Sequence, residues 1–356
     1  MNLNTTFKNK KVFLTGHTGF KGAWMCVWLT MLGAKVKGYA LKPEKQSLYG
    51  LIKSKIKIES VIADIRDQNR LRNELLAFDP DFVFHFAAQA LVRRSYKFPV
   101  ETFETNVTGT VNVLDALRYL KKKCVCVIVT TDKVYENIEA DYAYKESDKL
   151  GGYDPYSASK AAAEIAVNSY RLSFFNPEYF KKHKKSVATA RAGNVIGGGD
   201  FAEDRIMPDI FRALSSEKPV VLRNPNAVRP WQHVLEPLHG YLTLAAALAS
   251  KPQKFASAYN FGPKLNDTFT VEQLVKLAIN SWESGVYKVF ESKNAPHEAG
   301  LLKLSIAKVK KDINWQPKWK SGKAISVTVM WYKKSLTQKH NAFQLCEKDI
   351  EDYLSR

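Results

Sequence analysis

The residues with the clearest chemical potential are Tyr156 and Lys160, which are four positions apart. If this stretch is helical, both side chains lie on one face of the helix. A neighbouring ammonium lowers the pKa of a phenol, so Tyr156 could act near neutral pH as a base toward a substrate hydroxyl. The spacing is common by chance, and its meaning depends on the elements around it.

A second polar group, Thr131, Asp132 and Lys133, directly follows the apolar run Cys124–Val129, a predicted strand. Open α/β sheets bind ligands beyond the carboxyl ends of their strands. At such an edge the threonine could supply a hydroxyl hydrogen bond, the aspartic acid a proton and the lysine a second base. The alternative is an ordinary polar loop after a buried strand.

Three glycines, Gly16, Gly19 and Gly22, lie between a predicted strand at 11–15 and a predicted helix at 20–32. Such glycines let the backbone turn sharply and approach a pyrophosphate, whose charge the helix N-terminus favours. The pattern predicts a dinucleotide site, in which Lys160 could hold the nicotinamide ribose; a ligand-free turn is the alternative. The intervening His17, Thr18 and Phe20 are included in the predicted site, although His17 could simply fill the turn.

The adenosine end of this site is less well defined. An acid at the end of the second strand would favour NAD, but residues 38–43 contain none, and Lys42 could tolerate a 2′-phosphate. The sequence therefore leaves NAD and NADP open. Asp64 and Ile65, after the predicted strand at 60–65, are placed at the adenine by analogy, or else form an ordinary strand end.

Strand and helix signals alternate along the first half of the chain. Strands apolar on both faces, each followed by a helix, predict an α/β fold with a Rossmann-type doubly wound parallel sheet. We expect an NAD(P)-binding domain over 1–190 and a smaller C-terminal α/β substrate-binding lobe over 191–356, with some chain returning to the core. The predicted strands are 11–15, 36–40, 60–65, 82–86, 124–129 and 186–190, with shorter ones near Val220 and Ala258, and the predicted helices are 20–32, 69–77, 99–116, one after Tyr156, 241–249 and 271–282.

Together these features resemble the extended short-chain dehydrogenase/reductases over nearly the whole chain, including Ala87, Ala88 and Gln89 after the fourth strand and Asn106 further on. The resemblance implies that these four residues also contact the cofactor. Longer strings resemble more narrowly the nucleotide-sugar 4,6-dehydratases, specifically those that act on CDP-glucose. These strings are GHTGFKG at 16–22, TDK at 131–133, RAGNVIGGGD at 191–200 and RPWQHV at 229–234.

That resemblance implies a lyase that converts CDP-glucose to CDP-4-keto-6-deoxyglucose. Tyr156 would remove the 4-hydroxyl proton while C4 is oxidised, a base would take the C5 proton, and an acid would protonate the departing 6-hydroxyl before C6 is reduced. Asp132 and Lys133 are the expected acid and base, although related dehydratases carry Glu where this chain has Lys133. Two alternatives remain: a GDP-linked hexose or heptose 4,6-dehydratase, and a nucleotide-sugar 4-epimerase.

The resemblance also implies that the second lobe holds the nucleotide. The expected substrate contacts share positions in or beside the family strings and are Asn194, Arg205, Arg229, Trp231, His297 and Glu298. The arginines could instead be surface residues, Trp231 could simply pack, and His297 and Glu298 could form a loop salt bridge.

The composition restricts the remaining classes. The net charge of +19 is compatible with nucleic-acid binding, but the basic clusters are not interleaved with aromatic residues as a base-stacking surface would be. We expect no membrane span, no secretory signal, no metal site and a cytoplasmic location. By resemblance we further expect a homodimer or higher homo-oligomer and a role in deoxysugar synthesis for lipopolysaccharide or capsule. A non-catalytic NAD-bound protein is disfavoured by Thr131, Tyr156 and Lys160 being present together.

Overall fold

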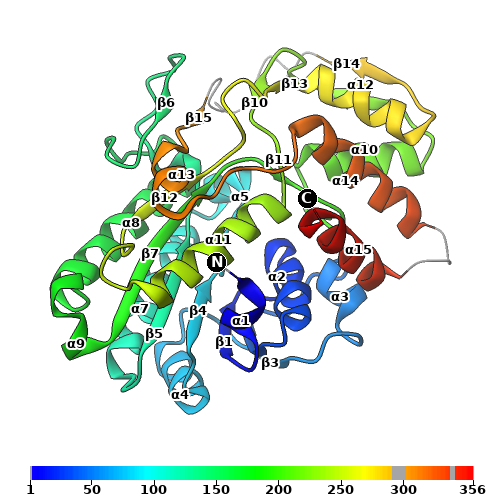
Figure 1. Ribbon diagram of the computed structural model, residues 1–356. Helices are drawn as coiled ribbons and strands as arrows, with labels where there is room; N and C mark the ends of the chain where they lie inside the picture. Colours follow the sequence, from blue (N-terminus) through cyan, green and yellow to red (C-terminus); the bar gives the residue numbers. More distant parts are fainter. Residues whose placement is uncertain (1, 291–301, 337–340, 356) are drawn as a thin grey trace.

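The computed structural model describes residues 2–290, 302–336 and 341–355. Its centre is a seven-stranded parallel sheet in the order β12-β7-β5-β4-β1-β2-β3 (Figure 1). The strand order reverses between β1 and β4, and such a reversal marks the ligand-binding crevice of an open α/β sheet. The strands are β1 (Lys11–Thr15), β2 (Lys35–Ala40), β3 (Glu59–Ile62), β4 (Phe82–His85), β5 (Cys124–Val129), β7 (Lys185–Ala192) and β12 (Ala258–Phe261).

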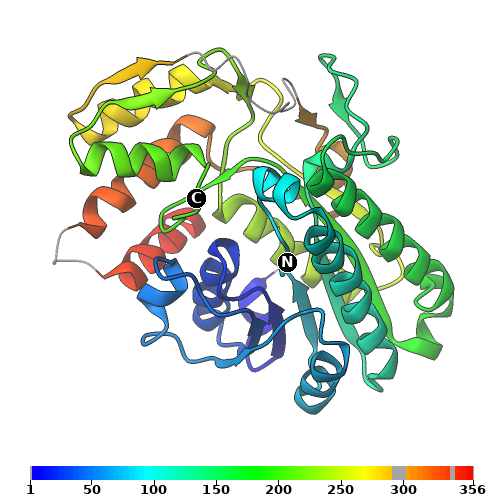
Figure 2. The same ribbon diagram turned by 180° about the vertical axis from the view of Figure 1, so that it is seen from behind.

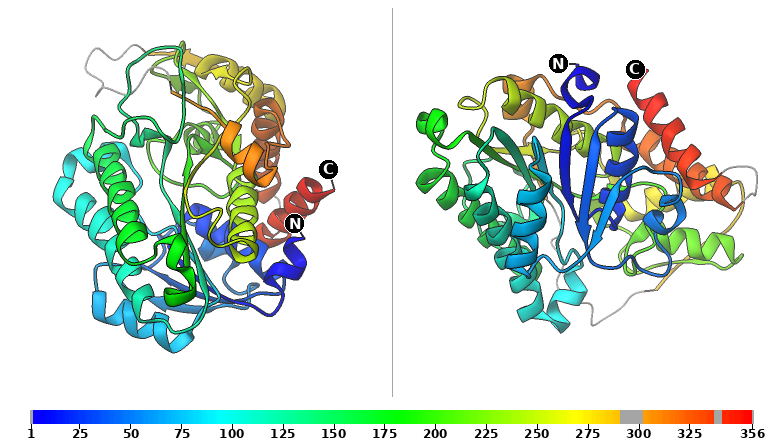
Figure 3. Two further views of the ribbon diagram at one scale, coloured as in Figure 1. Left: turned by 60° about the vertical axis from the view of Figure 1, so that its left-hand side comes forward. Right: turned by 90° about the horizontal axis from the view of Figure 1, so that it is seen from below.

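Helices cover both faces of this sheet (Figures 2 and 3). One face packs against α2 (Phe20–Met31) and α11 (Leu235–Ser250) in the larger hydrophobic core. The opposite face packs against α4 (Gln68–Phe78), α7 (Gly109–Tyr119) and α8 (Pro155–Ser173) in a second core. Every residue of β5 and β7 is buried, which explains the continuous apolar character of β5. The predicted doubly wound parallel sheet is confirmed.

The third strand is shorter than predicted and ends at Ile62 rather than at 65. The last ladder bond joins Ala63 N–H to the Ala40 carbonyl. Beyond it, the carbonyls of Asp64 and Ile65 accept from the side chains of Tyr39 and Asn112 at 3.0 and 3.1 Å. These two carbonyls bond to side chains instead of to the backbone of a neighbouring strand, so the chain leaves the sheet after Ala63.

The helix predicted over 99–116 is interrupted. It consists of α6 (Pro99–Phe103), a π-helical turn η1 (Glu104–Thr108) and α7, which continues to Tyr119. A π turn widens the helix locally and is frequent at functional sites. Here the turn contains the buried Asn106, and the helical period of the sequence does not reveal it.

The chain after β7 builds a second lobe, seen at the top of Figure 1. Three strand pairs belong to it: β8 (Val195–Ile196) with β11 (Gln232–His233), β9 (Val220–Leu222) with β14 (Tyr287–Val289), and β10 (Val228–Arg229) with β13 (Phe269–Thr270). Its helices are α10 (Ile206–Ser215), α12 (Val271–Trp282) and α14 (Ser321–Ser335). The strand β6 (Ala143–Tyr144) pairs with β15 (Lys303–Leu304) beside it.

Parts of the C-terminal half return to the sheet. The strand β12 pairs with β7, α11 packs on β5, and the last helix α15 (Ala342–Leu354) packs on α2. The domain boundary at 190/191 therefore stays a prediction. In the described residues, no helix combines the length and the apolar character needed to cross a membrane. The remaining helices are α1 (Leu3–Phe7), α3 (Leu48–Ile52), α5 (Val92–Lys97), η2 (Asp132–Val134), η3 (Pro177–Tyr179), α9 (Phe180–His183) and α13 (Ala307–Ile313).

Candidate active site at the carboxyl edge of the sheet

The turn between β1 and α2 is compact enough to require glycine. Gly16 has a φ of +75°, and a Cβ there would lie 2.7 Å from the backbone nitrogen of Ala87. A Cβ on Gly22 would lie 2.1 Å from the Gly16 carbonyl oxygen. The N-cap of α2 is Gly19, which has no side chain to occupy the free amides of the first turn. These amides could hold a pyrophosphate, as the glycine spacing predicts.

The other residues of this turn have structural partners. His17 is buried, and its Nε2 lies 2.7 Å from the Ser60 hydroxyl. Its ring occupies the space above Gly38, where a Cβ would meet the imidazole at 2.3 Å. Burial lowers the pKa of His17 to about 4, so the ring is neutral. These contacts support the alternative in which His17 fills the turn. The Thr18 hydroxyl donates to the Leu41 carbonyl at 2.9 Å.

At the predicted adenine end, the Asp64 carboxylate is already engaged. Arg66 binds it through Nε and Nη2, and this hydrogen bonding holds the pKa of Asp64 below its usual range. Ile65 is buried against α7, where a Cβ on Gly109 would lie 2.7 Å from its Cγ2. A direct contact from the Asp64 carboxylate to a ligand would have to compete with Arg66.

The residues after β4 are joined to the π turn. Asn106 accepts from the Gln89 backbone N–H at 2.9 Å and donates to the Gln89 carbonyl at 3.0 Å. Its amide also donates to the Ser159 hydroxyl on α8 at 2.8 Å. The backbone N–H of Ala87 donates to the Thr15 hydroxyl at 3.2 Å, which places Ala87 and the following Ala88 beside the glycine turn. Asn106 therefore links the predicted cofactor loop to the helix that carries Tyr156.

Tyr156 and Lys160 lie in the first turns of α8, which begins at Pro155 after the N-cap Asp154. Tyr156 forms a side-chain hydrogen bond with Thr131. Burial raises the pKa of Tyr156 to about 12, and the opposing effects of Thr131 and of the Arg205 charge do not offset it. The expectation of a lowered phenol pKa is therefore wrong for the protein alone, because desolvation outweighs the Thr131 hydrogen bond and the Arg205 charge.

The side chain of Lys160 is buried and donates to the Val129 carbonyl at 3.2 Å. Burial lowers its pKa to about 8, while the nearby Glu164 carboxylate opposes the decrease. Lys160 thus lies at the end of β5, next to Thr131 and on the same helix face as Tyr156. The three residues predicted to act together do lie together.

Asp132 and Lys133 contact each other directly. The Thr131 hydroxyl donates to Asp132 Oδ1 at 2.9 Å, and Lys133 Nζ lies 3.5 Å from the same oxygen. The Asp132 side chain is 1% exposed, whereas that of Lys133 is 31% exposed. Gly193 leaves room for the carboxylate, since a Cβ there would lie 2.2 Å from Asp132 Oδ2. The expected acid and base form an ion pair, and Thr131 connects this pair to Tyr156.

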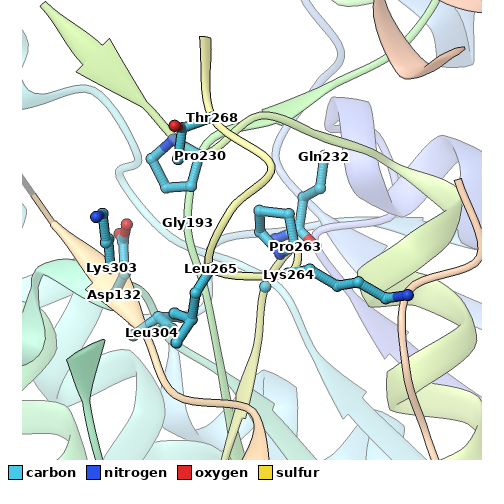
Figure 4. Close-up of a pocket in the computed structure, with 11 residues that line it drawn as sticks. Asp132, Gly193, Pro230, Gln232, Pro263, Lys264, Leu265, Thr268, Lys303 and Leu304 are labelled. Atoms are coloured by element: carbon cyan, nitrogen blue, oxygen red, sulfur yellow. The ribbon is translucent and has the colours of Figure 1, made fainter. Parts of the chain in front are cut away.

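A cavity opens from Asp132 toward the second lobe (Figure 4). Its lining includes Gly193, Gln232, Lys264 and Lys303. In the view of Figure 4, Asp132 and Lys303 lie on one side and Gln232 and Lys264 on the other.

Three of the predicted substrate residues, Asn194, Arg229 and Trp231, lie next to the cavity lining along the chain but are not part of it. Asn194 follows β7, and its carbonyl accepts from Gln232 N–H at 3.1 Å. Arg229, in β10, is half-buried and donates to the Val228 carbonyl at 3.2 Å. Trp231 is 7% exposed and belongs to the hydrophobic core, which favours packing over stacking on a ligand. His297 and Glu298 lie outside the described residues.

Arg205 is located beside the catalytic candidates rather than on the surface. Its Nη1 lies 2.9 Å from Asp200 Oδ2, and its charge lowers the pKa of Tyr156. Asp200 is the last residue of the RAGNVIGGGD string, so this ion pair joins the string to Arg205.

Residues 13–328 match the family model described as GDP-mannose 4,6 dehydratase. The chain is 44% identical over 351 residues to a CDP-glucose 4,6-dehydratase of Salmonella typhimurium, and the match covers 98% of this chain and 97% of the relative. This chain belongs to the nucleotide-sugar dehydratase family.

Solved structures support the fold of this dehydratase-family chain. A dTDP-glucose 4,6-dehydratase from Bacillus anthracis, solved in complex with NAD, superimposes with a TM-score of 0.75 at 21% identity and covers 91% of this chain and 97% of its own. A UDP-N-acetylglucosamine 4-epimerase from Methanobrevibacter ruminantium gives 0.78 at 21% identity, with 92% and 100% covered. At these identities the likeness establishes the sheet and its two helix layers.

Two residues of the site, Lys21 and Glu164, were not predicted from the dehydratase motifs. Burial and the charge of Arg205 lower the pKa of Lys21 to about 7, and Lys21 also interacts electrostatically with Asp132 and Lys160. Its position inside the glycine string, between Phe20 and Gly22, was an available signal. Glu164 is four residues after Lys160, so the helical spacing that linked Tyr156 to Lys160 also extends to it.

Proposed function

We propose that this protein converts CDP-glucose to CDP-4-keto-6-deoxyglucose and water. The observation that carries the proposal is a set of linked contacts. Thr131 contacts Tyr156, Asp132 pairs with Lys133, and Thr131 also bonds to Asp132. The first pair suits removal of a hydroxyl proton, and the second suits an elimination that needs a base and an acid. The 44% identity to a CDP-glucose 4,6-dehydratase along the whole chain supports CDP-glucose as the substrate.

We propose NAD as the cofactor. The tight glycine turn and the uncapped N-terminus of α2 fit a dinucleotide, and related structures were solved with NAD. When bound, NAD supplies the reversible oxidation at C4 and the later reduction at C6. Gly16, Gly19 and Gly22 would hold its pyrophosphate, and Lys160 its nicotinamide ribose.

In the first step, Tyr156 accepts the proton of the 4-hydroxyl. The hydrogen bond with Thr131 and the charge of Arg205 favour the phenolate, against the burial that raises the pKa of Tyr156. In the elimination, Lys133 first gives a proton to Asp132 within their ion pair and then accepts the C5 proton, made acidic by the 4-ketone. Asp132 as a neutral acid protonates the 6-oxygen, which leaves as water. Lys133 returns this proton to C5 as C6 is reduced. The proton that Tyr156 took from the 4-hydroxyl then equals the one that Asp132 gave to the leaving water, and it passes from Tyr156 to Asp132 before the next cycle.

The substrate is tested by incubating the purified protein and NAD separately with CDP-glucose, GDP-mannose, dTDP-glucose and UDP-N-acetylglucosamine. We expect the alkali-induced absorbance of a 4-keto product with CDP-glucose alone. Turnover of GDP-mannose instead would favour the GDP-linked alternative, and formation of the 4-epimer without loss of water would identify an epimerase. Mass spectrometry distinguishes these outcomes, because dehydration removes one water from the sugar.

We also propose a homodimer formed through α6 and α8. Val100 and Ile165 are apolar, yet 70% and 60% of their surfaces are exposed, and Phe103 lies nearby in a groove that Val100 also lines. Exposed apolar groups gathered in this way favour association. Sedimentation should show a dimer that the double variant Val100→Glu/Ile165→Glu converts to a monomer. Ile138→Glu, at a 63% exposed position in the loop before β6, is the matched control and should remain dimeric. A monomeric wild-type protein at micromolar concentration would contradict the proposal.

The location and pathway are further proposals. We propose that the enzyme acts in the cytoplasm and that its product feeds deoxysugars of lipopolysaccharide or capsule. The proposed product, a 4-keto-6-deoxy sugar nucleotide, supports the role in deoxysugar synthesis.

A further inference from the structure

One turn beyond Lys160 on α8 lies a third buried polar residue, Glu164. It is 3% exposed and accepts three hydrogen bonds from side chains. The donors are Thr130 Oγ1 at 2.6 Å, Thr189 Oγ1 at 2.8 Å and Arg191 Nη2 at 2.9 Å. A buried carboxylate with this many donors is ionised and fixed in position. Although burial alone would raise the pKa of Glu164, Arg191 and these hydrogen bonds hold it below its usual value.

One hydrogen bond of Glu164 reaches the segment that follows β5 and carries Thr131. Thr130, its donor on one carboxylate oxygen, lies between Val129 and Thr131. The carbonyl of Val129 accepts from Lys160, and the side chain of Thr131 contacts Tyr156. One carboxylate therefore joins the helix that carries Tyr156 and Lys160 to the strand end that carries Thr131.

Glu164 also acts on Lys160 through its charge. Side chains four residues apart on a helix are neighbours, and in a buried region their charges are weakly screened. Burial of Lys160 favours loss of its proton, and the Glu164 carboxylate opposes that loss.

Other charged groups around the two residues come from several elements. His85 on β4 and Lys21 on α2 interact with Lys160, and both are shifted toward their neutral forms by burial. On η2, Asp132 and Lys133 pair with each other. On the far side of Glu164 lies the paired Arg191 on β7. Arg171, further along α8, also interacts electrostatically with Glu164.

We propose that Glu164 is a positioning residue that keeps Lys160 in its ammonium form and holds Thr131 in register with Tyr156. The inference deepens the proposed function, because it concerns the charge state and placement of residues assigned to the reaction. The property itself belongs to the protein without substrate, and it can be measured independently of turnover.

The test is an NMR titration of isotope-labelled lysine Cε in the full-length protein, with the Lys160 signal assigned by its loss in Lys160→Arg. Glu164→Gln keeps the size and two hydrogen-bonding groups but removes the charge. Its Lys160 should titrate at a pKa lower than wild type by about one unit or more. The alkaline limb of the pH–rate profile should move to lower pH by the same amount, because the ammonium is lost earlier.

The matched control is Thr189→Val, which removes one hydrogen bond to Glu164 but leaves its charge. We expect an unchanged Lys160 pKa in that variant, with at most a lower melting temperature. If Glu164→Gln leaves the Lys160 titration in place, the proposal is wrong even if activity falls. If Glu164→Gln does not fold because Arg191 lacks a partner, Glu164→Gln/Arg191→Met removes both charges and should still lower the Lys160 pKa. An enzyme inactive on every nucleotide sugar, but with the expected titration shift, would refute the proposed function and leave the role of Glu164 intact.

Discussion

Tyr156→Phe is expected to lower the dehydratase rate by about a thousandfold, within the range that a positioned acid–base group contributes. The phenol is the group in contact with Thr131, and phenylalanine keeps the ring while removing the proton acceptor. Because the loss affects the first step, neither reduced cofactor nor 4-keto product should accumulate. Stopped-flow absorbance of the reduced nicotinamide, together with product assays at saturating CDP-glucose, measures both quantities.

The control for this variant is Tyr170→Phe, further along α8. Tyr170 is half-buried near the C-terminal end of α8 and is not part of the site. Its replacement should leave turnover within about twofold of wild type, since surface and helix changes away from special contacts have small effects. Cofactor affinity and melting temperature should be similar in both variants. A Tyr156→Phe protein with wild-type turnover would show that another group accepts the 4-hydroxyl proton.

Lys133→Met is expected to separate oxidation from elimination. The methionine fills a similar volume without an amine, so Tyr156 can still act at C4 while the C5 proton stays in place. We expect reduced cofactor to form and persist, and 4-keto-6-deoxy product to fall by about a thousandfold. In D2O, recovered substrate should contain no deuterium at C5.

Asp132→Asn provides the complementary result. With the amine present and the acid removed, C5 should exchange with solvent deuterium while water is lost slowly. Lys149→Met is the matched control, because Lys149 is a 77% exposed lysine that is also ion-paired, here with Glu136. If C5 exchanges at the wild-type rate in Lys133→Met, a residue other than Lys133 is the base. Lys21 would then be the first to examine, since it interacts with Asp132 and its pKa is lowered to about 7.

The arrangement of the sheet followed from local patterns. The strands β1 and β5 and the helix α12 have the predicted bounds, because apolar periodicity and glycine turns act over a few residues. The prediction failed at the π turn around Asn106 and at the end of β3. Both depend on side chains distant in sequence: Gln89 and Ser159 in the first case, Tyr39 and Asn112 in the second.

The sequence by itself determined the parallel sheet, the dinucleotide-type turn, and the placement of Tyr156 and Lys160 on one helix face, since each is encoded by short spacings along the chain. Only the tertiary structure decided the protonation tendencies: the high pKa of Tyr156, the lowered pKa of Lys160, and the pairing of Glu164 with Arg191. The physical reason is that proton affinity depends on desolvation and on charges brought in from other strands and helices. Desolvation and these distant charges arise only when the chain packs, so a local sequence pattern cannot predict them.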